Sequence, residues 1–137
     1  MPPARTSTNG MNWKVISMQK KSQEDYLEAI LIQINKVGAC RVTDIARQIG
    51  FTKASTSVAL KKLEEDGLVI RDDWRVLLTD KGYTTAKATY EKHLFFVEWL
   101  DKLGIEKRVA EEEACGIEHI ISDDTYKKIK KFVEDRV

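Results

Sequence analysis

The sequence predicts a mainly α-helical protein in which one short β-hairpin separates a helical first part from a helical second part. Apolar residues recur at helical spacing through most of the chain after residue 22. A stretch typical of two short strands and a polar turn lies between residues 68 and 78. Glycines end most of these helical patterns, as is common at helix C-termini: Gly38, Gly50, Gly67 and Gly104.

The composition suits a globular protein. The 137 residues are 42% hydrophobic and 33% charged, which fits one compact domain or two small ones sharing a core. No apolar run approaches the roughly 18 residues that a membrane span requires, and the N-terminus has no signal-peptide pattern. We therefore expect a cytoplasmic protein without a membrane partner. Two cysteines, Cys40 and Cys115, do not suggest a disulfide framework.

The charges are distributed unevenly along the chain. Residues 1–90 contain 14 Lys and Arg against 10 Asp and Glu, whereas residues 91–137 contain 9 against 12. A basic first part fits contact with a polyanion, and an acidic second part fits the binding of cations.

The first helix is expected to begin at Ser22 and to end at Gly38. Residues 1–21 lack sustained periodicity and are predicted to be a flexible arm. In the helix, Asp25 and Glu28 are three residues apart, so both carboxylates share a face. Acids in a first helical turn ordinarily interact with the helix dipole, so this pair does not by itself indicate a binding site.

A helix-turn-helix follows. Thr43 is the expected cap of a short helix over residues 44–49, and Thr52 caps a longer one from Lys53 to Asp66. On the longer helix Thr56, Leu60 and Leu63 line one side. The opposite side is small and basic, so it can lie in the major groove of DNA while its lysines meet phosphates. Its predicted DNA-binding residues are Thr52, Lys53, Ala54, Ser57, Val58 and Lys61.

The hairpin directly after this helix completes a winged helix-turn-helix over residues 22–80. Leu68–Arg71 and Trp74–Leu78 are the expected strands, with the turn at Asp72 and Asp73. Arg71 and Arg75 are predicted to reach the DNA backbone from this wing. A surface hairpin with merely solvated arginines remains the alternative.

Residues 81–137 are predicted to form a helical dimerisation domain. A long helix runs from Thr79 and Asp80 to Leu103 and concentrates apolar residues in its second half: Leu94, Phe95, Phe96, Val97, Trp99, Leu100 and Leu103. One face of a monomer cannot bury so many, so we expect a second copy to cover part of them. Two more helices follow, over residues 106–121 and 123–136, the latter capped by Ser122.

The helix over residues 106–121 contains a group of potential metal ligands. Cys115, Glu118 and His119 stand at i, i+3 and i+4, so a thiol, a carboxylate and an imidazole point the same way. These donors suit a divalent transition metal. A buried Cys beside a solvated Glu-His pair is the simpler alternative. His93, alone on an apolar helix, is more often a hydrogen-bonded core residue than a ligand.

The order of these parts resembles the diphtheria-toxin-repressor family of metal-dependent transcriptional regulators, including its manganese-transport-regulator branch. Four motifs carry the resemblance: residues 24–28 (EDYLE), 42–46 (VTDIA), 77–82 (LLTDKG) and 115–119 (CGIEH). The resemblance implies the short form without the C-terminal SH3-like domain. It also implies that metal bound between a winged-helix domain and a dimerisation domain lets a homodimer bind a palindromic double-stranded operator.

The resemblance also implies the ligands. The main site would use Asp25, Cys115, Glu118 and His119, and a neighbouring site would use Glu28 and His93. The manganese branch has Glu at the position of Cys115, and the iron branch has Met at the position of Asp25, so this donor set is a hybrid. The thiolate favours softer metals and the carboxylates accommodate manganese, so we expect Fe(II) or Mn(II) rather than zinc.

The expected function is a metal-dependent transcriptional regulator, a repressor of metal-uptake genes. An enzyme acting on a small organic substrate is not expected, since no zinc-hydrolase helix motif, nucleophile elbow or phosphate loop accompanies the ligands. The alternative is a metal-independent winged-helix regulator in which Cys115 is redox-sensitive or structural.

Overall fold

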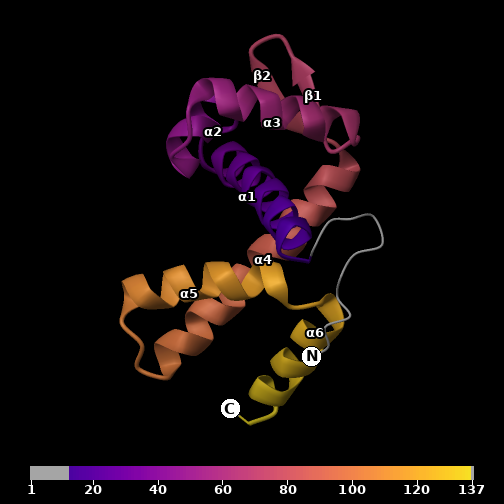
Figure 1. Cartoon of the computed structure of the whole chain (residues 1–137). Coiled ribbons are helices and arrows are strands. Elements are labelled where there is room, and N and C mark those ends of the chain that lie inside the picture. The colour runs from indigo at the N-terminus through magenta and orange to yellow at the C-terminus, as the bar shows by residue number, and fades with distance from the viewer. Residues whose placement is uncertain (1–12, 137) are drawn as a thin grey trace. The chain divides into compact units, whose positions relative to one another are not determined.

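The computed structural model describes residues 13–136 and confirms a mainly helical chain with one β-hairpin (Figure 1). Its elements are α1 (Trp13–Val37), α2 (Val42–Ile49), α3 (Lys53–Glu65), β1 (Val69–Asp72), β2 (Arg75–Leu78), α4 (Asp80–Lys102), α5 (Lys107–Ile120) and α6 (Asp123–Glu134). The chain divides into two compact units between Lys87 and Ala88, inside α4. None of the described helices is both long enough and apolar enough to span a bilayer.

The first helix is longer than the sequence pattern predicted. We expected it to begin at Ser22, but α1 begins at Trp13, so residues 13–21 of the predicted flexible arm are helical. These residues include neither Gly nor Pro, and most of them are tolerated in helices. The helix can therefore extend through them even though no periodic apolar pattern predicts it. Residues 1–12 of the predicted arm lie outside the described residues.

The cap of α2 also differs from the prediction. Thr43 lies inside the helix, and Arg41 is the N-cap residue. The reason is Asp44, whose Oδ2 accepts a hydrogen bond of 2.9 Å from the backbone N–H of Arg41. An acidic side chain at the third helical position thereby satisfies the amide that precedes the helix. Gly50 then ends α2 with a φ of 87°, a conformation that glycine adopts without strain.

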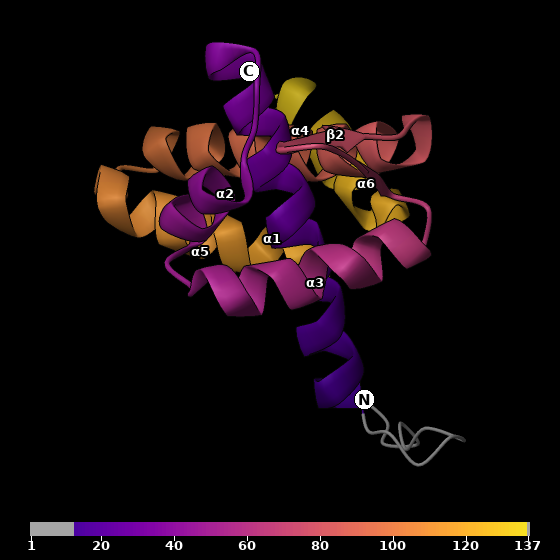
Figure 2. The same cartoon turned by 90° about the horizontal axis from the view of Figure 1, so that it is seen from above.

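In the first unit α2 and α3 both pack against α1 (Figures 1 and 2). The apolar core formed by these helices and β2 is fully buried, and it includes Leu27, Ile30, Ile45, Leu60 and Val76. Thr52 caps α3 as predicted, because its Oγ1 accepts a hydrogen bond of 3.0 Å from the N–H of Ser55. Gly67 takes a φ of 75° after the helix, which confirms the predicted left-handed end.

The hairpin is antiparallel, with Val69 opposite Leu78 and Asp72 opposite Arg75. Its turn therefore lies at Asp73 and Trp74, one residue later than we predicted, and Asp73 adopts a φ of 57°. Asp tolerates the left-handed region better than most residues, which allows this tight turn.

The second unit comprises the rest of α4 with α5 and α6. Phe96 of α4 is its largest buried side chain, 1% exposed. Ring contacts join α4 to α6, since the ring centroid of Tyr126 lies 5.6 Å from that of Phe95 and 6.1 Å from that of Phe96. Leu94 of the same helix and Leu103, directly after its end, stay exposed. Part of the apolar surface predicted for a second copy is thus open in the single chain.

Candidate DNA-reading surface and metal centre

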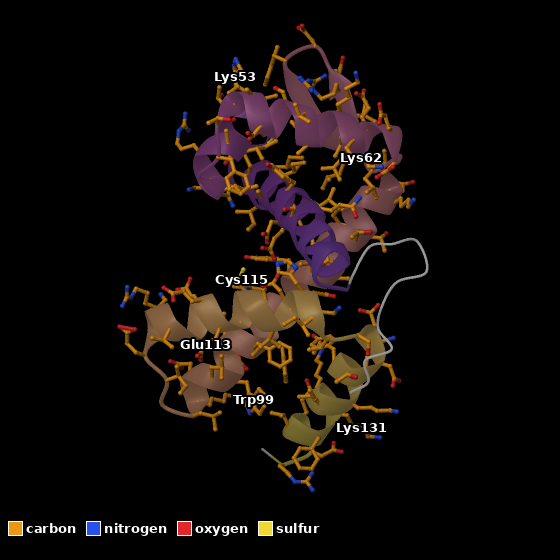
Figure 3. The ribbon with its side chains drawn as sticks, in the orientation of Figure 1. Lys53, Lys62, Trp99, Glu113, Cys115 and Lys131 are labelled. Atoms are coloured by element: carbon orange, nitrogen blue, oxygen red, sulfur yellow. The ribbon has the colours of Figure 1, made fainter. Side chains whose placement is uncertain are left out.

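The outward surface of α3 has the small and basic character that we predicted. Thr56, Leu60 and Leu63 are buried, whereas Val58 on the other side is 73% exposed. Lys53, Ala54 and Lys61 are exposed and Ser57 is half-buried. Figure 3 shows Lys53 at the beginning of α3 and Lys62 towards its end. A helix with short side chains between lysines can approach base edges while its ends meet phosphates.

The two wing arginines differ in what they contact. Arg71 of β1 is half-buried, and its Nε is buried without a hydrogen-bond partner among the described residues. Arg75 of β2 is exposed, but its guanidinium donates to the carboxylate of Asp72 across the turn. The ion pair of Arg75 means that this residue would meet a phosphate only in competition with an acid of its own hairpin.

Asp25 and Glu28, the predicted ligands of the first unit, are half-buried on α1. Tyr26 between them is buried, and burial raises the pKa of its hydroxyl. The same hydroxyl forms a hydrogen bond with the side chain of Thr56 on α3. The hydroxyl of Thr56 in turn donates a hydrogen bond of 2.8 Å to the backbone oxygen of Thr52. The segment with the two acids is therefore joined through side chains to the beginning of α3.

The predicted ligands of the second unit lie on α4 and α5. Glu118 and His119 are buried, and Cys115 is half-buried one turn earlier on the same helix, where Figure 3 also labels it. Nδ1 of His93 on α4 lies 2.7 Å from Oε1 of Glu118. Nε2 of His119 lies 4.0 Å from Oε2 of the same carboxylate. Glu118 thus brings together His93 and His119, which the resemblance assigned to separate metal sites.

The donors of the second unit fit a divalent cation. Glu118 is 1% exposed, and its Oε2 accepts no hydrogen bond from any described residue. A buried carboxylate is unfavourable unless hydrogen bonds or a cation compensate for its lost hydration. One imidazole already contacts the first oxygen of Glu118, and the second oxygen is left for a further positive group. This environment agrees with the thiol, carboxylate and imidazole donors found on one helix.

The two cysteines have different environments, and neither is in a disulfide. Cys40 is completely buried before α2, and burial, with a smaller contribution from Asp44, raises the pKa of its thiol to about 12. A thiol of that acidity is a poor nucleophile and a poor ligand at neutral pH. Cys115 is the accessible one of the pair.

Lys92, which the sequence did not single out, is 7% exposed. Its Nζ lies 2.7 Å from Oδ1 of Asp123, at the beginning of α6. The pair attaches α6 to α4 at the position next to His93. No local signal distinguishes this lysine from the many solvated lysines of the chain, because its partner comes from another helix.

Two family models match the chain. Residues 18–75 match the N-terminal DNA-binding domain of iron-dependent repressors, and residues 79–136 match the metal-binding and dimerisation domain of these repressors. The transcriptional regulator MntR of Escherichia coli O157:H7 is 32% identical over 112 residues, which are 81% of this chain and 72% of that protein. An uncharacterised HTH-type transcriptional regulator of Methanocaldococcus jannaschii is 33% identical over 120 residues, covering 83% of this chain and 94% of that one.

Solved structures agree. The manganese regulator SloR matches with a TM-score of 0.70 at 30% identity over 82% of this chain. The match covers 53% of SloR, so the chain spans about half the length of that protein. The matches confirm the resemblance drawn from the four motifs. They assign DNA binding to the winged helix-turn-helix, and metal binding and dimerisation to the helical part after it. The chain belongs to the iron-dependent repressor family of metal-dependent transcriptional regulators.

Proposed function

We propose that this chain is a repressor of metal-uptake genes whose homodimer binds a palindromic operator when Mn(II) or Fe(II) is bound. The observation that carries the proposal is the buried Glu118, with one oxygen at His93 and the other without a hydrogen bond among the described residues. Relatives named as manganese regulators support the choice of metal. A cytoplasmic location agrees with this function.

The proposed main ligands are Cys115, Glu118 and His119 of α5 together with Asp25 of α1, with Glu28 and His93 beside them. The grouping of the three α5 residues on one face supports the first part of this set. The motif that contains Asp25 and Glu28 supports the second part. A bound cation would supply the positive charge that neutralises these carboxylates.

In the proposed mechanism, residues of both units would hold the same ion, so the winged unit and the dimerisation unit would become fixed to each other. Without that coordination the carboxylates repel one another. Tyr26, next to Asp25, is hydrogen-bonded to Thr56 of α3, so fixing α1 also fixes the DNA-reading helix. In a homodimer this sets the separation of the two α3 helices, which must match successive major grooves.

A direct test measures operator affinity with and without metal. The probe is a fluorescent duplex selected from a random-sequence library by the Mn(II)-loaded protein. Anaerobic titrations with Mn(II), Fe(II), Zn(II) and excess chelator follow fluorescence anisotropy. We expect Mn(II) or Fe(II) to raise the affinity by roughly 5- to 150-fold, the usual range of such coupling. Equal affinity in excess chelator would contradict the proposal.

A further inference from the structure

Three side chains meet at the turn of the hairpin in the first unit. The guanidinium carbon of Arg41 lies 4.2 Å from the ring centroid of Trp74, and that of Arg75 lies 5.9 Å from it. Trp74 is nevertheless 45% exposed. A tryptophan ring attracts a cation to its face and holds it without taking its N–H donors. The ring therefore positions a positive charge at the protein surface.

Backbone hydrogen bonds bring these residues together. The N–H of Val76 on β2 donates a hydrogen bond of 2.8 Å to the carbonyl oxygen of Cys40. This bond places the segment before α2 beside the hairpin. The N–H of Arg41 donates to Asp44, which fixes Arg41 as the first residue of the α2 cap. The position of Arg41 at the hairpin thus depends on main-chain bonding as well as on its contact with the ring.

The charges of the two arginines are not equally available. Arg75 is paired with Asp72, so most of its charge is compensated inside the hairpin. Asp73 at the turn adds a second acid, exposed to solvent. Within residues 22–136, the structure gives the Arg41 guanidinium no carboxylate partner. Of the arginines around Trp74, Arg41 is the one that can bind an external anion without breaking an ion pair.

We propose that Arg41, held on the ring of Trp74, contacts the sugar-phosphate backbone of the DNA, and that Arg75 acts only by holding Trp74 and Asp72 in place. This inference depends on the proposed function. It replaces Arg75, one of the two wing arginines that the sequence predicted to contact DNA, with a residue that the sequence did not single out. Arg41 precedes the first helix of the helix-turn-helix, the helix that crosses the DNA backbone in such modules. Figure 1 shows the hairpin turn on the side of α3 that is away from α1.

Salt dependence tests the inference, because each phosphate contact releases counterions. For duplex DNA the slope of log K against log salt changes by about 0.9 for each contact. We would measure binding of the selected duplex in Mn(II) at NaCl concentrations between about 50 and 200 mM. The homodimer has two copies of Arg41, so Arg41→Ala and Arg41→Gln should each reduce the slope by about 1.8, and the salt-induced loss of affinity should be about twelvefold smaller.

Matched variants identify the cause. Arg41→Lys keeps the charge and should keep the slope, whereas Arg75→Ala should leave the slope as in the wild type. Arg108→Ala, an exposed arginine of α5, is the control for the lost charge alone. Circular dichroism shows whether each variant is folded, and Arg41→Gln replaces Arg41→Ala if the latter is not.

The outcomes separate this inference from the proposed function. If the wild-type protein binds the duplex equally well with Mn(II) and with chelator, the proposed function is wrong. If the wild type binds in the expected metal-dependent way and the slope of Arg41→Gln equals that of the wild type, only the role of Arg41 is wrong. A reduced slope in Arg75→Ala would also overturn it.

Discussion

Nδ1 of His93 on α4 lies 2.7 Å from Oε1 of Glu118 on α5, so one short contact joins two helices through two candidate ligands. Because Glu118 is buried, its carboxylate has lost hydration that neighbouring groups must replace.

Glu118→Gln should abolish most of the stabilisation by Mn(II), since an amide keeps the size of the side chain but is a much weaker ligand. At a free Mn(II) concentration 100-fold above Kd, one bound ion stabilises the wild type by about 2.7 kcal/mol. We expect less than half of that in the variant, measured as the Mn(II)-induced rise in Tm. Glu113→Gln, an exposed position of the same helix (Figure 3), is the control and should respond like the wild type. Identical Mn(II) responses of Glu118→Gln and the control would remove Glu118 from the ligands.

Alkaline pH should destabilise the metal-free protein through Cys40. The folded-state pKa of this thiol is raised to about 12 from an ordinary value of 9.0. Between these values the folded state keeps the proton and the unfolded state loses it. The contribution of this thiol to the free energy of unfolding is therefore fully present below pH 9.0 and is lost as the pH rises towards 12. The slope for one such group is at most about 1.4 kcal/mol per pH unit. Denaturant titrations from pH 8 to 10.5 should show a shallower decline for Cys40→Ala, and parallel curves would contradict the assignment.

Gly82→Ala should destabilise the first unit. Gly82 lies in the first turn of α4, and a Cβ there would stand 1.9 Å from the backbone oxygen of Leu68. Backbone must move to relieve this overlap, at a cost of about 1–3 kcal/mol. At Gly116 of α5 an added Cβ meets no described atom within 4 Å, so Gly116→Ala should gain about 0.5–1 kcal/mol from helix propensity. The two variants should therefore shift the metal-free Tm in opposite directions, and a shift in the same direction would be contrary to the packing described here.

Thr52→Ala should lower the free energy of unfolding by about 1 kcal/mol, because it removes the acceptor for the N–H of Ser55. Thr43→Ala should have a smaller effect, since Thr43 is an exposed residue inside α2 and not its cap. Urea titrations of both metal-free variants compare the two. A larger loss for Thr43→Ala would show that the cap of α2 lies where we first expected it.

Leu94→Ala should weaken the homodimer and leave the fold intact. Leu94 is 49% exposed in the single chain, on the helix whose apolar residues we assign to the dimer contact. We expect the dissociation constant of the dimer, measured by sedimentation equilibrium, to increase about tenfold, which is equivalent to about 1.4 kcal/mol. Glu91→Ala, exposed one turn earlier, is the matched truncation and should not change the dimer. Phe96→Ala should instead lower the stability by about 3–5 kcal/mol, as is typical of a buried aromatic residue.

Local signals in the sequence were sufficient for most element boundaries. Gly38, Gly67 and Gly104 all adopt positive φ where a helix was expected to end. Ser122 caps α6 through the N–H of Thr125, as predicted. Each of these features depends on residues within a few positions of one another, which is why a pattern can predict it.

The errors occurred where a signal was absent or where two signals competed. No apolar stripe marks residues 13–21, so the beginning of α1 could not be read from periodicity. At α2, Thr43 is a good cap by residue type, but the carboxylate of Asp44 selects the N–H of Arg41 instead. The choice between two adjacent capping arrangements depends on the geometry of the preceding loop.

The sites combine residues from several elements, which spacing alone cannot pair. Helical spacing predicted that Cys115, Glu118 and His119 share a face of α5. It could not reveal that His93 contacts Glu118, because that depends on how α4 turns towards α5. The contact between Arg41 and Trp74 depends in the same way on a hydrogen bond between Val76 and Cys40.

The two tryptophans with described side chains are divided between the two units, and this gives the protein built-in optical reporters. Trp74 lies at the hairpin beneath Arg41, and Trp99 lies beside Phe95 and Phe96 in the second unit. Replacing Trp13 and one of these two by Phe leaves a single fluorophore in a chosen unit. Emission and quenching of the variant that keeps Trp74 would report DNA binding at the wing. The variant that keeps Trp99 would report changes in the dimerisation unit, and neither needs an added label.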